Sequence, residues 1–149
     1  MKKSTILTIT LGLLVGIQFI RPDKNILEQP TENDITHEMK LPLEVKEILQ
    51  ISCYDCHSNT TNYPWYNQVA PVSWMIANHI NEAKEHLNFS EWSLYNNNQK
   101  EHILEDIEEV LTENKMPLKS YLLMHNDGEI TDQERQYILE WIALEQMKK

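Results

Sequence analysis

Glycine is scarce in this chain of 149 residues. Only three glycines occur, Gly12, Gly16 and Gly128, and the first two fall in an N-terminal apolar run. Because tight β-turns depend on glycine, a fold built from many short hairpins is disfavoured and a mostly helical protein is indicated. The chain also lacks internal repeats and low-complexity segments, and its length suits one domain with a modest core.

Cysteine is scarcer still, and the only two occur together in the stretch Cys53-Tyr54-Asp55-Cys56-His57. A structural zinc site needs four ligands, usually two Cys/His pairs, and the sequence has no second pair. A thioredoxin-like redox pair needs a neighbouring βαβ pattern, whereas the flanks here resemble a helix and an aromatic loop. A disulfide would close a loop of two intervening residues and would gain little stability.

A fourth interpretation fits the same stretch better. Cys-x-x-Cys-His is the attachment site of a c-type haem, in which both thiols bond to the porphyrin and the adjacent histidine binds the iron. Two residues between the cysteines let one helical turn present both sulfurs to one porphyrin edge. The sequence therefore predicts one covalent haem c at Cys53 and Cys56, with His57 as an iron ligand.

Positive charge is also in deficit, since the formal net charge is −10. Four basic residues and one acidic residue fall within residues 1–24, so residues 25–149 carry −13. Such a surface repels nucleic acid and favours a redox partner protein with a basic docking face, although general solubility explains much of the charge.

The N-terminus contains the one long apolar run. No charge occurs from Ser4 to Ile20, basic residues flank the run, and no Ala-x-Ala-like cleavage site closes it. As a helix these residues would reach about 25 Å, the short end for a bilayer core. We therefore predict a membrane anchor over residues 1–24, a linker over 25–40 and a haem-binding domain over 41–149. The anchor would place the domain in the periplasm on the inner membrane, and cleavage would instead release a soluble periplasmic protein.

Helical periodicity continues through the domain. The pattern predicts helices over about 41–53, from Pro71 to about His86, over about 98–113, and after a capping box that begins at Thr131. Within the second of these, His79 and His86 are interpreted as polar-face or packing histidines.

Met116 is the candidate for the second iron ligand. Pro117 keeps it out of the helical region, so its flexible thioether lies in a loop. Ligation by histidine and methionine raises the reduction potential and leaves no open coordination position. His125 is the alternative ligand, and a core-filling methionine is the plain structural alternative.

Aromatic residues follow the motif in a stretch too rich in turn formers for a helix. Tyr63, Trp65 and Tyr66 lie there, and Trp74 follows in the next predicted helix. Aromatic side chains that also carry a polar donor suit the rim of a haem, so these four are candidate cofactor contacts. Ordinary core packing explains each of them equally well.

Several motifs in a fixed order resemble those of the bacterial haem-binding domain proteins, exported relatives of cytochrome c. The matching segments span nearly the whole chain: Phe19 to Pro22, Cys53 to Asn59, Tyr63 to Tyr66, Trp74, His79-Ile80, Asn88 to Trp92, Met116 to His125, and Trp141. The resemblance implies covalent haem at Cys53 and Cys56 with His57 on the iron. It also implies an all-α, cytochrome-c-like fold whose first and last helices pack together.

The sequence thus favours an electron carrier rather than a catalyst. In this hypothesis His57 and Met116 close the coordination of the iron, which alternates between ferrous and ferric states. A second hypothesis is a haem enzyme or gas sensor in which Met116 does not bind and the sixth position is open. A third is a redox or interaction module without haem, in which the cysteines remain thiols.

Overall fold

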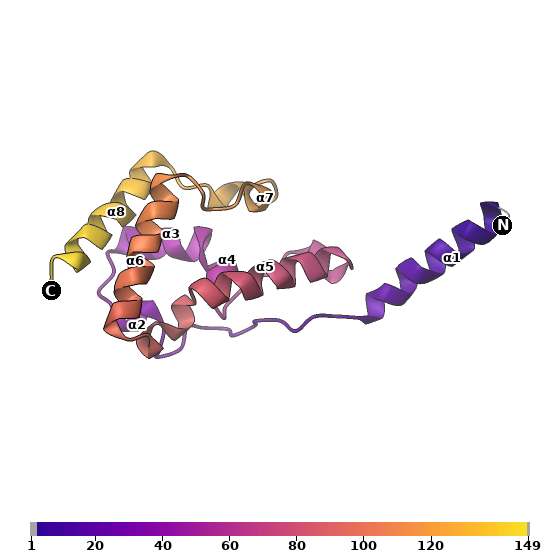
Figure 1. Ribbon diagram of the computed structural model, residues 1–149, viewed down its shortest axis with the longest axis horizontal. Coiled ribbons are helices and arrows are strands. Elements are labelled where there is room, and N and C mark those ends of the chain that lie inside the picture. The colour runs from indigo at the N-terminus through magenta and orange to yellow at the C-terminus, as the bar shows by residue number, and fades with distance from the viewer. Residues whose placement is uncertain (1–2, 149) are drawn as a thin grey trace.

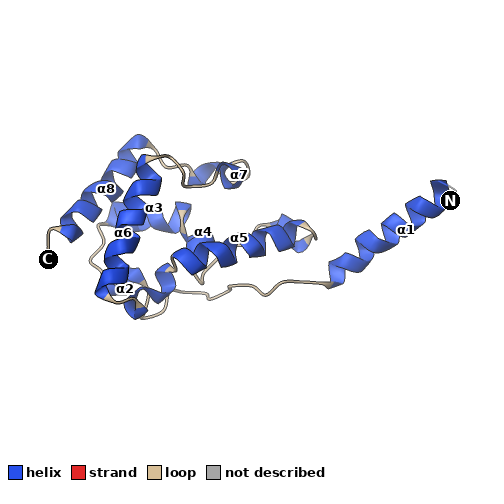
Figure 2. Ribbon diagram, viewed as in Figure 1, coloured by secondary structure: helices blue, strands red, loops and turns tan. Residues whose placement is uncertain are grey.

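The protein is helical throughout the part that the computed structural model describes, residues 3–148 (Figures 1 and 2). Between these residues no strand forms beyond one isolated bridge, Ile26 to Thr60. The elements are α1 (Lys3–Gly16), η1 (Ile17–Phe19), α2 (Ile35–Glu38), α3 (Leu43–Ser52), α4 (Tyr54–His57), η2 (Trp65–Gln68), α5 (Val72–His86), η3 (Phe89–Leu94), α6 (Asn97–Thr112), α7 (Lys119–Leu122), η4 (Asn126–Gly128) and α8 (Asp132–Gln146), where η denotes a 3-10 helix. The expectation of a helical protein is confirmed for these residues.

The longer helices begin where the sequence supplies caps. At α8 the hydroxyl of Thr131 accepts from the backbone N–H of Glu134, and the Glu134 carboxylate accepts from the Thr131 N–H at 2.8 Å. This is the predicted capping box, and it satisfies donors that an α-helix leaves unpaired at its start. Asn96 and Gln99 form the same arrangement at α6.

The core lies where α3, α6 and α8 meet. Each of these helices turns an apolar stripe inward, and α8 packs against both α3 and α6. The residues they bury include Val45, Leu49, Leu104, Ile138 and Ile142. The first and last helices of the domain therefore pack together, as the resemblance implied.

The prediction of an N-terminal membrane anchor is wrong. Helix α1 ends at Gly16, so its 14 residues reach only about 21 Å against a bilayer core of about 30 Å. Nowhere in residues 3–148 is a helix both long enough and apolar enough to span a bilayer. The predicted position on the inner membrane is contradicted by the same finding. Met1 and Lys2, which belonged to the predicted anchor, lie outside the described residues.

Helix α1 ends before the apolar run does, because the last residues of the run are bound to the domain. The side-chain amide of Gln18 donates to the carbonyl of Ala70 at 3.1 Å and accepts from the Ala70 N–H at 2.9 Å. The indole of Trp74 donates to the carbonyl of Ile20 at 2.8 Å. These contacts hold the last residues of the run in a 3-10 turn and an extended segment instead of a continuing helix.

The segment predicted as a linker partly packs into the domain. Asp34 and Ile35 have no exposed surface, and the Asp34 carboxylate caps α2. The same carboxylate accepts a hydrogen bond from the hydroxyl of Tyr54 at 2.8 Å. The chain before the domain is thereby tied to the turn that carries the two cysteines.

Candidate functional site

The Cys-x-x-Cys-His motif occupies one short helical turn. Helix α3 ends at Ser52, Cys53 departs from helical geometry, and α4 then carries Cys56 and His57. The carbonyl of Cys53 accepts from the N–H groups of both Cys56 and His57, at 3.2 and 2.9 Å. The backbone therefore presents the two sulfurs and the imidazole from a single turn, as the residue spacing predicts.

Both cysteines are free thiols in the structure. Burial, with a smaller contribution from Cys56, raises the pKa of Cys53 to about 12, and burial with Asp55 raises the pKa of Cys56 to about 11. Redox-active Cys-x-x-Cys pairs show the opposite behaviour, because a lowered pKa is what makes their thiolate reactive. The environment of these cysteines therefore disfavours a thioredoxin-like pair.

His57 is held in one tautomer by the backbone. Its Nδ1 lies 3.1 Å from the carbonyl oxygen of Leu87, at the end of α5. A carbonyl only accepts, so this contact requires the proton on Nδ1 and leaves the lone pair of Nε2 free to bind a metal. Burial lowers the pKa of His57, which favours the neutral imidazole that acts as a ligand.

Two cavities open beside this turn. Their volumes are about 300 and 480 Å³, within the range typical of small-molecule sites. The motif residues Cys53 and His57 line both cavities, as do Met116 and His79. The first cavity extends toward tyrosines and His125, and the second extends into the apolar core between α3, α5 and α6.

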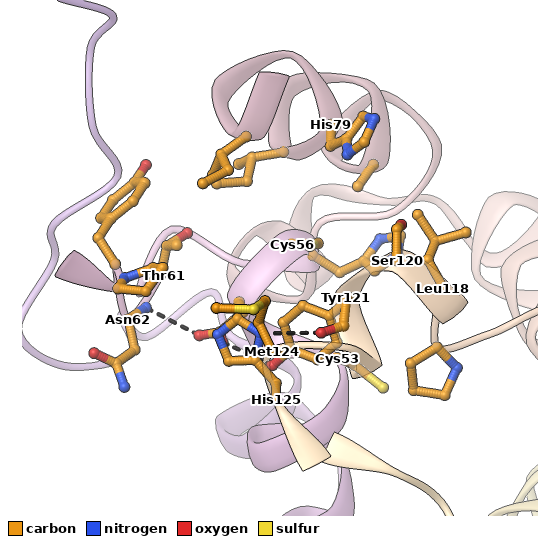
Figure 3. A pocket seen from close by; sticks show the side chains of 18 of the residues that line it. Cys53, Cys56, Thr61, Asn62, His79, Leu118, Ser120, Tyr121, Met124 and His125 are labelled. Carbon is orange, nitrogen blue, oxygen red and sulfur yellow. Dashed lines mark hydrogen bonds between the residues drawn. The ribbon is translucent and has the colours of Figure 1, made fainter. Parts of the chain in front are cut away.

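A stacked aromatic pair closes one side of the first cavity (Figure 3). The rings of Tyr121 and His125 lie 4.2 Å apart and nearly parallel, and the Tyr66 hydroxyl lies 3.4 Å from Nε2 of His125. The Tyr121 hydroxyl donates to the Asp55 carboxylate at 2.8 Å, and burial together with Asp55 raises the pKa of Tyr121. This bond connects the segment after Met116 to the motif itself. Figure 3 shows His79 on the other side of the cavity.

Both candidates for the second iron ligand, Met116 and His125, lie at the cavities. Met116 is in the loop between α6 and α7, as predicted, and it is the one of the two that lines both cavities. His125 lines the first cavity, where Tyr66 and Tyr121 already contact it. The position of Met116 suits an iron ligand, and its ligation remains a prediction.

The four predicted aromatic contacts divide into two pairs. Tyr63 and Tyr66 line the first cavity. Trp65 is 78% exposed and packs edge-on against Tyr66, while Trp74 binds the carbonyl of Ile20, and neither tryptophan lines the two cavities. The structure thus brings the tyrosines to the site and leaves both tryptophans outside it.

Sequence reasoning missed several residues at the site. His79 and Ala83 lie one helical turn apart on α5 and both line both cavities, so helical spacing could have indicated that this face points at the site. Phe89 stacks on Tyr54 at 5.4 Å and meets the His57 ring edge-on at 6.4 Å. Phe89 lies in the matching segment Asn88 to Trp92, but its contact with the motif spans more than 30 residues of chain and could not be read from that segment.

The site suits a haem in three respects. Its lining is largely apolar, two thiols and an imidazole with a free Nε2 converge on it, and the hydroxyl of Thr61 at the first cavity is buried without a hydrogen-bond partner. A buried hydroxyl without a partner is costly, so Thr61 is suited to donate to a ligand carboxylate such as a haem propionate.

Comparison with known proteins agrees with this chemistry. No curated protein and no solved structure is significantly similar to the chain. One family model, described as a haem-binding domain, matches residues 12–144, which is most of the sequence. The chain therefore belongs to the haem-binding domain family, and this membership supports haem as its ligand.

Proposed function

We propose that the protein carries one c-type haem, bonded covalently to Cys53 and Cys56, and that it transfers single electrons between partner proteins. The observation that carries this proposal is the shared lining of the two cavities. Cys53, His57 and Met116 border both spaces, so one planar group lying across them would meet the attachment residues and a second iron ligand.

The position of the two thiols supports covalent attachment. Cys53 and Cys56 form no disulfide, burial raises the pKa of both thiols, and one helical turn presents them. Each thiol would add across a vinyl group, forming a carbon–sulfur bond while its hydrogen goes to the neighbouring carbon. This addition needs neither an oxidant nor a reductant.

The bound haem supplies one-electron chemistry between ferrous and ferric iron. His57 would bind through Nε2, since Nδ1 is engaged with Leu87, and Met116 would bind through its thioether. Two protein ligands leave no position for a substrate, which suits an electron carrier rather than a catalyst. The net charge of −10 favours a partner whose docking face is basic.

A second candidate function is a haem enzyme or sensor with an open sixth position. The first cavity favours it, because Tyr66, Tyr121 and His125 place hydrogen-bonding groups beside the space a small ligand would enter. Such groups govern ligand binding in haem proteins that leave the iron open. In this function Met116 would not bind iron.

Mass spectrometry of denatured protein tests the covalent bond. Protein matured with c-haem assembly factors should keep a mass increase equal to one haem after unfolding. The double variant Cys53→Ala, Cys56→Ala should lose the increase entirely, and the control Ser52→Ala should keep it. Release of haem from the unmodified protein on denaturation would contradict the proposal and indicate a non-covalent haem protein.

A further inference from the structure

The carbonyl that holds His57 belongs to a peptide unit that is bound at both ends. The Leu87 carbonyl faces Nδ1 of His57 at 3.1 Å. The N–H of the same peptide unit, that of Asn88, donates to the hydroxyl of Tyr95 at 2.9 Å. A continuous line of hydrogen bonds therefore runs from Tyr95 through one peptide group to the imidazole.

The rest of this segment is fixed as well. Leu87 and Asn88 are buried, and the Asn88 side chain accepts from the Ser90 N–H at 3.1 Å and donates to Asn59 at 3.2 Å. The Tyr95 ring meets the buried Trp92 edge-on, with 6.1 Å between ring centroids. The hydroxyl of Tyr95 is thus held against a peptide group that has little freedom to turn away.

Hydrogen bonds in such a line strengthen one another. An amide whose N–H is engaged has a more negative carbonyl oxygen, which is a better acceptor. A better acceptor for the Nδ1 proton makes Nε2 more basic and more electron-donating toward a bound metal. The strength of the bond at His57 therefore depends on the group at the far end of the peptide.

We propose that Tyr95 is a positioning residue for the haem ligand His57, acting through the Leu87–Asn88 peptide group on the orientation and basicity of the imidazole. The inference shares one assumption with the proposed function, namely that His57 binds the iron. Tyr95 lines neither of the two cavities. Its effect on the site is indirect.

The test compares haem-loaded protein with the variant Tyr95→Phe, which removes the hydroxyl and keeps the ring on Trp92. Two quantities are measured: the NMR signal of the His57 Nδ1–H in the reduced state, with its exchange rate, and the midpoint potential. We expect the proton signal to move upfield, its exchange to become several-fold faster, and the potential to become more positive because ferric iron loses donation. Tyr137→Phe is the control, since that hydroxyl binds Gln133 on α8.

A purely structural role for Tyr95 would lower the melting temperature and leave the His57 signal unchanged, and that result would overturn the inference. A shifted signal with an unchanged potential would support the positioning role but contradict His57 as the iron ligand, which is a failure of the proposed function. Because the His57 signal does not depend on thioether bonds, the comparison remains decisive if the haem proves non-covalent.

Discussion

The two walls of the proposed haem site are built differently. The wall that carries His57 is packed into the core: Phe89 is 1% exposed, Tyr54 is buried, and the imidazole is held by Leu87. The wall that carries Met116 belongs to a loop and α7, which project from α6 and α8 in Figure 1. On that wall Leu123 is 79% and Met124 is 61% exposed.

The difference shows which part of the site folding prepares in advance. Core packing and the Leu87 carbonyl fix the tautomer and direction of His57. The Met116 wall depends on fewer contacts, chiefly the hydrogen bonds from Lys115 and Met116 to the Val110 carbonyl and the bond from Tyr121 to Asp55. We infer that the fold determines the first iron ligand, whereas haem binding completes the wall of the second.

The largest effect is expected from His57→Ala. The imidazole is the proposed iron ligand that core packing orients, so its loss should abolish the low-spin visible spectrum of the matured protein. His102→Ala is the matched control, because that histidine is 75% exposed on α6 and should leave the spectrum intact. A normal low-spin spectrum in His57→Ala would remove His57 from the site.

Met116→Ala tests the second wall. Loss of the thioether should open the sixth position, so that the reduced protein binds carbon monoxide while keeping its covalent haem. Met124→Ala is the control, since Met124 lines only the first cavity and is largely exposed. If Met124→Ala binds carbon monoxide and Met116→Ala does not, the two methionines have been assigned the wrong roles.

The stability losses caused by Phe89→Ala, on the His57 wall, and by Leu123→Ala, on the Met116 wall, compare the packing of the two walls directly. Removing a fully buried phenylalanine that contacts both Tyr54 and His57 should lower the free energy of unfolding by about 3–5 kcal/mol. Leu123 is mostly exposed, so its truncation should change the free energy by no more than about 0.5 kcal/mol. Denaturant titration measures both, and equal losses would erase the contrast between the walls.

Thiol reactivity tests the packed wall before haem is attached. The pKa values of about 12 and 11 for Cys53 and Cys56 exceed the ordinary value of 9.0, so at any pH below them less thiolate is present. In the haem-free chain, alkylation by iodoacetamide at neutral pH should be slower by about 100-fold or more than in the unfolded chain, and it should accelerate as the pH approaches 11. Fast alkylation at neutral pH would mean that the motif is not buried.

Several structural features around the candidate site could be predicted because their signals are local. The Cys-x-x-Cys-His spacing fixes one helical turn, Pro117 keeps Met116 in a loop, and Thr131 with Glu134 marks the start of α8. Each of these features depends on residues within a few positions of one another. The helical class and the expectation of haem binding rest on such short-range patterns.

The features that sequence reasoning missed depend on contacts between distant residues. Leu87 and Phe89 reach His57 across some 30 residues, and the matching segment Asn88 to Trp92 does not reveal that contact. The anchor prediction failed for the same reason: composition alone makes Ser4 to Ile20 one apolar run, but the bond from Gln18 to Ala70 ends its helical character early. Trp65 and Trp74 are candidate haem contacts in the sequence, and in the structure Trp65 packs edge-on against Tyr66 and Trp74 donates to the Ile20 carbonyl.

The measurement that tests the central claim most directly is the visible spectrum of the matured protein, oxidised and reduced, with and without carbon monoxide. Ligation by both His57 and Met116 predicts a low-spin spectrum, a weak methionine–iron band at the red end of the visible range in the oxidised form, and no change on adding carbon monoxide to the reduced form. A high-spin spectrum that shifts with carbon monoxide would contradict the closed site and favour an enzyme or sensor.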